Sequence, residues 1–570
     1  MKKLHKLSAL ALAIAGIATT NVAHALNPWT DGAPDFTIYT SGGAAQDTAY
    51  QETVFEALSV PGSVDVFQDV LTGSSNGSRF TAYYFTGAST LTDFALRGKK
   101  ILLEKRSLGA AGYGVVPLIA NINLDHLDIF HSATSQLQAT WTNTTTASNI
   151  GGTTYNVPFH AASITNANAA TFLTSTKSHG GFAGVDAAAL LKPGTENYPD
   201  PIKEVSTNAA TAGWVSGYKA KDLTPLTRIP TGGLIYGVAV TLDLYKVLQA
   251  AQKASGTLPA STVIGAYDQA SLPTLSRNFL AAILAGNIQH WSNVEVNVSG
   301  TRTPLNDASF LLAAGGGTTP LAAPTNDKVA VGRRNTGAAV GAVAYAKLLN
   351  YPYAESSVPP AQAVPNTTTD ETNSAPIVKS PGGASGTESL LVDWQAGSNT
   401  SGLNNVPNAK YWGIAIASAD KNATVTAAGT GGKAYRYVKI DGFAPTIENV
   451  ASGNYPYWAE GEVLVNPTVG TSHEVSLFTD FAHALSTNAV AAKVDTGLVQ
   501  PWGQTGVFAT TVTDQNSAID VPFSASHPIV PFTHLGGDGF THLGIVPYVS
   551  DNFIAGPTGA GATGAFIELQ

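Results

Sequence analysis

The chain of 570 residues has no cysteine, and its only methionine is the first residue. No disulfide can therefore cross-link the fold, and no thiolate can bind a metal ion. Charged residues are scarce, at 12%, against about 25% in average globular proteins. The net charge of −9 argues against binding of nucleic acid, because an acidic surface is repelled by phosphates. Stability must come from a sizeable apolar core, which a chain of this length can form.

The first 25 residues have the pattern of a secretory signal peptide. Lysines near the start give a positive charge, Leu7–Ile17 is a short apolar run, and Ala23–Ala25 has the small-x-small pattern of a cleavage site. This run is too short to cross a bilayer, and no later apolar run is long enough either. We therefore expect a mature chain that begins at Leu26, lacks a transmembrane segment, and acts in the periplasm or outside the cell.

Several short apolar segments run into glycine-rich turns that open helices. Phe36–Ser41 is followed by Gly42–Gln46, and Lys99–Lys105 is followed by Arg106–Val115. Ser380–Trp394 is a third turn of this kind. The first amides of a helix lack partners and lie at its positive end, so such turns can bind anions. A purely structural helix with an ordinary N-cap has the same pattern.

Histidine and aspartate gather in two places: at Asp125, His126, Asp128 and His131, and at His534, Asp538 and His542 within a repeated Phe-Thr-His-Leu-Gly unit. Neither group has a strong metal spacing such as His-Glu-x-x-His. We favour a solvated polar face for the first group and a duplicated hairpin for the second. The sequence also lacks a Gly-x-Ser-x-Gly elbow. It predicts no metal, no cofactor and no catalytic activity.

Three later segments carry the most information when they are taken in order. Leu234–Asp243 is an apolar strand, Ala281–Val294 is a helix end followed by a tryptophan, and Val329–Leu349 places two arginines before an apolar helix. Together with the earlier glycine turns, they resemble the phosphate-binding proteins among the periplasmic solute-binding proteins. The most specific match is the Gly-x-Ile-x-x-Trp pattern at Gly286–Trp291.

The resemblance implies an α/β fold, two-lobed like a type II periplasmic binding protein, with large loop insertions. The first lobe is expected from 26–230 plus 435–570, with a C-terminal extension, and the second from 231–434, joined by two crossovers. Stretches rich in Thr, Asn, Pro and Gly cannot supply a core face, so we expect them on the surface, outside both sheets. These stretches are 121–178, 300–328 and 350–378.

The resemblance also implies a ligand site in the cleft between the lobes. Carried over onto this sequence, its contacts are Thr40, Ser41, Gly43 and Ala44 in the first lobe, and Arg333 or Arg334, Thr336, Gly337 and Ala338 in the second. Helix starts, backbone amides and hydroxyls hold the ligand in this family. An arginine fork suits an oxyanion because it donates two parallel hydrogen bonds.

Three polar partners of the family are missing from this chain. Ala110 or Ala111 stands in place of a serine, Gly184 in place of the aspartate that accepts a phosphate proton, and Ala338 in place of a threonine. Each unsatisfied oxygen costs roughly 1–3 kcal/mol. We therefore expect phosphate to bind weakly or not at all.

The sequence predicts an exported, non-catalytic solute-binding protein whose ligand is a small molecule or an oxyanion. The expected partner is a transporter, or other copies of the chain at the cell surface, and not nucleic acid. The alternative is a secreted or cell-surface structural, adhesive or matrix protein, built on the same scaffold with a degenerate pocket. Low charge and long Thr- and Asn-rich loops favour that alternative, whereas the paired arginines and the glycine turns favour a binding protein.

Overall fold

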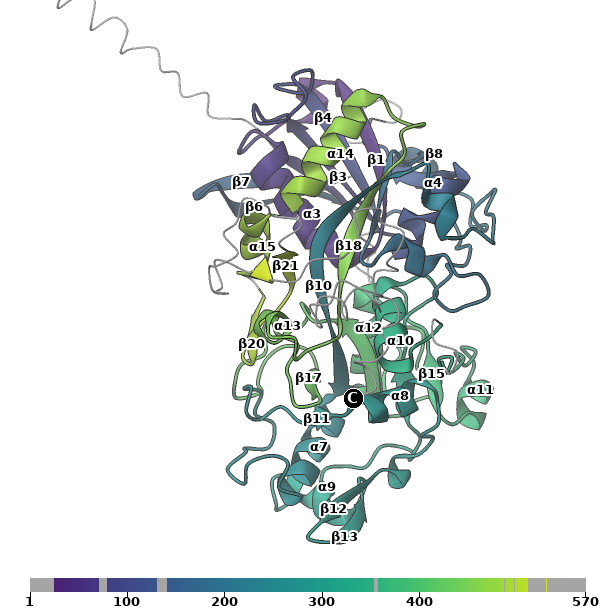
Figure 1. The fold of residues 1–570 in the computed structure, drawn as a ribbon, viewed down its shortest axis with the longest axis vertical. Coiled ribbons are helices and arrows are strands. Elements are labelled where there is room, and N and C mark those ends of the chain that lie inside the picture. Colours follow the sequence, from purple (N-terminus) through teal and green to yellow (C-terminus); the bar gives the residue numbers. More distant parts are fainter. Residues whose placement is uncertain are drawn as a thin grey trace, which may run out of the picture.

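The computed structural model describes residues 25–70, 79–130, 141–352, 357–485, 487–496, 498–510 and 529–530. Almost all of the expected signal peptide, His131 and the second histidine group lie outside these residues. Within them, every helix is too short or too polar to cross a membrane. Two lobes, one above the other in Figure 1, make up the molecule.

The upper lobe in Figure 1 is built on a mixed sheet with the strand order β9-β1-β4-β3-β2-β7-β6. Its strands are β1 (Phe36–Gly42), β2 (Asp65–Asp69), β3 (Phe80–Thr86), β4 (Lys100–Arg106), β6 (Thr142–Ile150), β7 (Thr153–Ala162) and β9 (Gly180–Ala183). Strand β1 is parallel to both β4 and β9. The carboxyl ends of these three strands therefore meet at one edge, where the chain turns into helices.

Both faces of this sheet are buried. In β4, Ile101 and Leu103 enter one apolar core while Leu102 enters another, as expected for alternating side chains.

The other elements of this lobe are α2 (Pro28–Asp31), η1 (Ala44–Gln46), α3 (Asp47–Thr53), η2 (Val54–Leu58), η3 (Ala111–Gly114), α4 (Val116–Ala120), β5 (Asn123–Leu127), α6 (Ala169–Phe172), β8 (Leu173–Lys177), η5 (Ala187–Leu190), η6 (Ala220–Leu223), α14 (Ser472–Leu485) and α15 (Asn488–Asp495).

Two long strands connect the lobes. Strand β10 (Thr227–Thr241) pairs with β18 (Trp458–Val465) through its first half, and with β16 (Gly413–Ser418) and β17 (Tyr435–Ile440) through its second half. Strand β10 begins at Thr227, close to the border expected at 230. The border expected near 435 falls at the start of β17, which pairs inside the lower sheet. The return passage is therefore β18, and the division into domains at 230 and 435 stays a prediction.

The lower lobe surrounds a second sheet with the order β15-β14-β16-β10-β17-β11. Its other elements are α7 (Leu242–Ala254), β11 (Thr274–Leu275), α8 (Arg277–Leu284), η7 (Trp291–Asn293), β12 (Glu295–Val298), β13 (Thr301–Pro304), α9 (Ala308–Ala314), β14 (Ala330–Gly332), α10 (Ala339–Leu349), α11 (Thr368–Asn373), β15 (Ile377–Lys379), α12 (Gly383–Ala396) and α13 (Ile447–Ala451). The Gly-x-Ile-x-x-Trp segment ends α8 and buries Trp291, whose indole donates a hydrogen bond of 3.0 Å to the Trp412 carbonyl.

After β18 the chain returns to the upper lobe. Strand β21 (Val507–Thr510) pairs with β10 and with β22 (Ile529–Val530), and β19 (Val499–Gln500) pairs with β20 (Gly503–Gln504). Because β21 pairs with β10 at Gly233 and Leu234, it adds backbone hydrogen bonds to the strand that joins the lobes.

The expectation that the polar stretches stay outside both sheets is wrong in two places. Part of 121–178 forms β6 and β7, and β7 pairs with β2 as an extension of the upper sheet. Part of 350–378 enters β15 at the edge of the lower sheet. Threonine is β-branched and favours strands, so a Thr-rich run extends a sheet through backbone bonds while its side chains stay exposed, as in β6. The stretch 300–328 lies outside both lobe sheets.

Candidate functional site

A cavity of about 420 Å³ lies between the two lobes. Its upper wall comes from the turns that follow β1, β4 and β9, and its lower wall from the turns that follow β14, β15 and β16. The lining includes Gly43, Ala44, Ala45, Asp47, Arg79, Leu108, Ala110, Ala111, Gly184, Ile202, Lys203, Arg334, Ala338, Val340, Gly382, Ala384 and Lys421. Ligands of open α/β sheets bind at such carboxyl ends.

Two long helices begin at the lower wall of this cavity. Helix α10 follows Ala338, and α12 follows Gly382. In the described structure, neither helix has a side-chain cap for its first amides. Serine, threonine or aspartate usually stands at this position. With alanine and glycine there instead, the amides and the positive ends of both helix dipoles are left for a bound group.

Arg334 supplies a buried positive charge in the same wall. Only 8% of the residue is exposed, and it lines the cavity. Among the described residues its guanidinium has no carboxylate partner, and its Nε atom has no hydrogen-bond partner. Burial away from water lowers the pKa of Arg334 to about 10, although the nearby Tyr457, Tyr236 and Tyr345 act to raise it. An uncompensated buried charge lowers the stability of a fold by roughly several kcal/mol. A bound anion beside Arg334 offsets that loss, so this position favours an anion.

Arg333 has a different environment, although it too is buried. Its Nη1 lies 3.1 Å from an oxygen of Glu196, so a carboxylate of the same chain neutralises it. The next residues of the loop are also occupied. The Thr336 hydroxyl donates to Asp200 at 2.9 Å, and the Gly337 amide donates to the Glu196 carbonyl at 3.4 Å. Arg333, Thr336 and Gly337 are absent from the cavity lining given by the described residues.

The segment 192–200, which we call the strap, provides these partners. It contacts both lobes, and Pro199 packs against Gly112 of the upper lobe and Gly337 of the lower lobe. A side chain at either glycine would collide with Pro199, because an added Cβ would lie 2.4 Å from it. The Gly112 amide also donates a hydrogen bond of 2.9 Å to the Gly337 carbonyl. The two lobes are therefore in direct contact beside the cavity.

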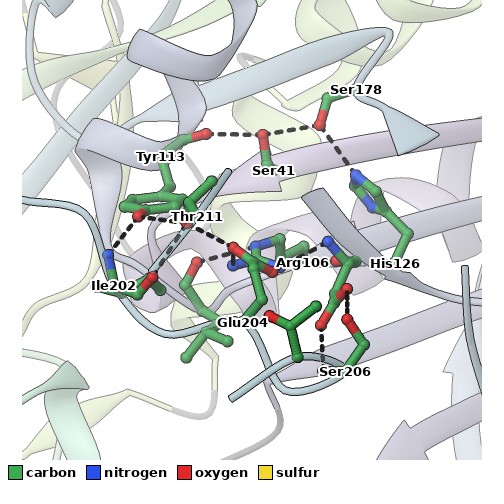
Figure 2. A network of polar contacts seen from close by, with 12 residues as sticks. Ser41, Arg106, Tyr113, His126, Ser178, Ile202, Glu204, Ser206 and Thr211 are labelled. Carbon is green, nitrogen blue, oxygen red and sulfur yellow. Dashed lines mark hydrogen bonds and ion pairs between the residues drawn. The ribbon is translucent and has the colours of Figure 1, made fainter. Parts of the chain in front are cut away.

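The chain beyond the strap is fixed to the upper lobe by the buried polar network in Figure 2. Arg106 makes two hydrogen bonds to Glu204, at 2.7 and 3.0 Å, and Thr211 donates to the same carboxylate at 2.7 Å. The Ile202 amide donates to the Tyr113 hydroxyl at 2.6 Å. A buried and fully bonded ion pair of this kind holds a segment in one position.

Thr40 and Ser41 lie beneath the cavity and not in its lining. Thr40 and Ser41 are both fully buried. The Thr40 hydroxyl donates to the Glu104 carbonyl at 2.6 Å. The Ser41 hydroxyl donates to the Tyr113 carbonyl at 2.8 Å and accepts from Ser178 at 3.1 Å (Figure 2). Of the first-lobe residues carried over from the family, Gly43 and Ala44 reach the cavity.

The first histidine group is not the solvated face that the sequence suggested. Asp125 and His126 are buried, and Asp125 accepts hydrogen bonds from the Ser206 amide and hydroxyl at 2.8 and 2.6 Å. Both residues lie in β5, whose pairing with β8 carries them beneath the sheet. Nowhere in the described residues do three or more histidine, aspartate or glutamate side chains gather closely enough to hold a metal ion.

Ser178, His126 and Glu104 have the order of a catalytic triad but not its access. The Ser178 hydroxyl lies 3.1 Å from His126 Nε2, and His126 Nδ1 lies 3.8 Å from a Glu104 oxygen. Burial holds the pKa of His126 well below its usual range and that of Glu104 well above it. All three are at most 3% exposed, and none of them lines the cavity. Their arrangement supports the interior of the upper lobe.

The strap is the part of the site that sequence reasoning missed. Residues 192–200 have no periodic pattern, and they lie far from 333–338 along the chain. Only the lack of any regular pattern over 192–219 could have marked it as a separate feature. The contact of Lys421 with Asp420, at 2.6 Å beside the cavity, was also not anticipated.

No family model and no curated protein matches the chain. Solved structures that it is similar to include an ABC-type phosphate transport receptor from Vibrio cholerae, with 10% identity over 59% of this chain and 86% of that one, and a TM-score of 0.25. PstS from Borrelia burgdorferi has 10% identity over 60% and 86%, with a TM-score of 0.24. A DING protein has 12% identity over 57% and 77%, with a TM-score of 0.28.

Proposed function

We propose that the protein is an exported, non-catalytic binding protein that holds a small anion in the interlobe cavity. The observation that supports this function is Arg334, a buried guanidinium that faces the cavity and has no counter-ion among the described residues. A fold keeps an unpaired buried charge at a cost in stability, so such a charge is a marker of a functional site. Delivery of the ligand to a transporter remains part of this proposal.

The groups around Arg334 suit an anion as well. The uncapped first turns of α10 and α12 present amides to the cavity, and Gly43 brings a third helix start from the upper lobe. A bound anion that accepts from these amides and from the Arg334 fork replaces water with several charge-assisted hydrogen bonds. Contacts from both lobes to one ligand are what hold a two-lobed binding protein closed.

Phosphate itself is a poor match for this wall. Ala110, Ala111, Gly184 and Ala338 all line the cavity, and none has a side chain that can bond to a phosphate oxygen. Gly184 in particular offers no carboxylate to accept the proton of a monohydrogen phosphate. The family's ligand therefore leaves oxygens without partners here, at roughly 1–3 kcal/mol for each.

A structural or adhesive surface protein is the second candidate, and the strap favours it. The Glu196 carboxylate lies beside Arg333, and the Glu196 carbonyl accepts from the Gly337 amide. Asp200 accepts from the Thr336 hydroxyl. Part of the segment that matches the family's anion loop therefore has its partners within the chain. In that case the cavity is a remnant, and Arg334 is tolerated without a ligand.

A thermal-shift and calorimetric test separates the two candidates. The mature chain from Leu26 is measured with phosphate, sulfate, acetate and longer carboxylates, as the wild type and as Arg334→Gln. The control is Arg302→Gln, which removes an arginine that is 83% exposed and far from the cavity. We expect anion-dependent stabilisation in the wild type and in the control, and none in Arg334→Gln. Self-association without any anion response would instead support the structural protein.

A further inference from the structure

We propose that the ligand is an organic acid, with one carboxylate at Arg334 and an apolar body that fills the rest of the cavity. The inference rests on the proposed function and adds the class of ligand to it. Three independent properties of the site lead to it: the size of the cavity, the chemistry of its wall, and the number of charges left without a partner.

The cavity is much larger than an inorganic oxyanion. It measures about 420 Å³, whereas one water molecule needs about 10–15 Å³ of such space. Pockets of about 300–1,000 Å³ are typical for organic ligands. Closure of the lobes cannot account for the excess volume, because Gly112 and Gly337 are already hydrogen-bonded across the cleft and Pro199 is wedged against both.

Much of the wall is apolar. The side chains that line it from both lobes include Ala45, Leu108, Ala110, Ile202, Val340 and Ala384. Leu108 and Ile202 belong to the upper lobe and Arg334 to the lower lobe. An acid that places its carboxylate on Arg334 and its body against Leu108 therefore contacts both lobes, and burial of the body contributes affinity in proportion to its apolar area.

The charges of the wall match a single negative group. Asp47 is paired with Lys105 at 2.8 Å, Lys421 with Asp420 at 2.6 Å, and Arg79 with Asp69 at 2.6 Å. Lys203 also lines the cavity, but it is exposed to solvent, which screens its charge. Arg334 is thus the only buried lining cation without a carboxylate partner in the described part of the chain. One such charge is balanced by a monocarboxylate, whereas a dianion would carry a second charge into an apolar space.

Calorimetry with a homologous series tests the inference on the mature chain at pH 7. The ligands are acetate, butyrate and hexanoate, with hexanamide as the uncharged analogue and with phosphate and sulfate as oxyanions. We expect affinity to rise about three- to fourfold for each added methylene. We expect hexanamide to bind at least tenfold more weakly than hexanoate, because it lacks the charge that pairs with Arg334.

A cavity-filling variant locates the apolar body. Ala384 lies in the first turn of α12 and lines the cavity, so Ala384→Leu reduces the space for the body without placing a strained residue in the helix. The matched control is Ala313→Leu, at an exposed position of α9 away from the cavity. We expect Ala384→Leu to weaken hexanoate at least tenfold more than acetate, and Ala313→Leu to change neither. Melting temperatures of both variants verify that they fold.

The two proposals fail in different ways. If phosphate, sulfate and acetate bind as tightly as hexanoate, and Arg334→Gln abolishes this binding, the organic-acid inference is overturned while the anion site stands. If no anion of the series binds to the wild type, the proposed function itself is overturned. If hexanoate and hexanamide bind equally well, the cavity takes an apolar ligand without using its charge, which also overturns the inference.

Discussion

Arg333 and Arg334 are neighbours in sequence and are almost equally buried, at 6% and 8% exposure, yet they have opposite environments. Glu196 of the strap lies 3.1 Å from Arg333. Arg334 turns to the other side of the loop, into the cavity, where no carboxylate of the described chain meets it. One short loop therefore holds an arginine that an internal carboxylate neutralises and, next to it, an arginine without a carboxylate partner among the described residues.

The largest expected effect is an opposite response of the two arginines to the same substitution. Arg334→Met removes an unpaired buried charge and should raise the stability of the unliganded protein by about 1–3 kcal/mol while abolishing the anion response. Arg333→Met leaves Glu196 without its partner and should lower stability by about 1–3 kcal/mol, a value reduced because Glu196 is partly exposed. Chemical denaturation of both variants without ligand measures the signs. Equal signs would remove the distinction between the arginines.

The second prediction removes the counter-ion of Arg333, so that Arg333, like Arg334, has no carboxylate partner. Glu196→Gln removes the internal carboxylate, so the loop then holds two buried guanidiniums without full compensation. We expect a loss of stability. We also expect a gain of about tenfold in the affinity for sulfate relative to acetate, because the uncompensated charge of Arg333, although outside the cavity lining, attracts a dianion more strongly than a monoanion. Glu295→Gln is a suitable control, since Glu295 is 45% exposed and far from the strap. An unchanged sulfate preference would mean that Arg333 cannot reach the ligand.

The pH dependence follows from the burial that lowers the pKa of Arg334 to about 10. An arginine in the unfolded chain keeps its ordinary, higher pKa. Between these values the unfolded state binds more protons, so the contribution of Arg334 to the free energy of unfolding rises with pH in that window. Anion affinity should change in the opposite direction. We expect it to be level from pH 7 to 9 and to fall about tenfold per unit above pH 10, as measured by calorimetry. Arg334→Gln should lack this fall.

The smallest effect concerns the strap alone. Thr336→Val removes the hydroxyl that donates to Asp200 at 2.9 Å in an exposed position. We expect a loss of no more than about 1 kcal/mol, with anion binding unchanged because Thr336 does not line the cavity. Hydrogen exchange should detect faster exchange in the strap. A large loss of anion binding would place Thr336 at the ligand and contradict the assignment of this loop.

Local chemistry was enough to predict the elements around the cavity. Gly43, Gly382 and Ala338 each stand directly before a helix, in a turn that follows a strand, and the ends of parallel strands must meet at one edge of a sheet. The two-lobed α/β class was implied by the family resemblance that these turns and the later segments carry in order. The sequence could not show that the hydroxyls of Thr40 and Ser41 bond within the upper lobe, since this depends on Glu104 and Tyr113.

The choice between Arg333 and Arg334 was also beyond sequence reasoning. The counter-ion that decides it comes from Glu196, in an irregular segment of the other lobe, and no local spacing links the two positions. For the same reason the polar stretches gave wrong expectations. Their composition predicts exposure, and β6 is exposed, but backbone pairing of β7 with β2 depends on an edge that composition does not reveal. Whether the cavity-lining residues bind a ligand stays a prediction.

The path of β10 has a consequence for how the protein unfolds. Its 15 residues pair with strands of both sheets, and the largest apolar core joins Ala111 and Leu464 of the upper lobe to Val343 and Trp394 of the lower lobe. Neither half can melt without pulling this strand and part of this core out of the other. Two domains on a flexible linker would give two calorimetric transitions, whereas this architecture should give a single cooperative one.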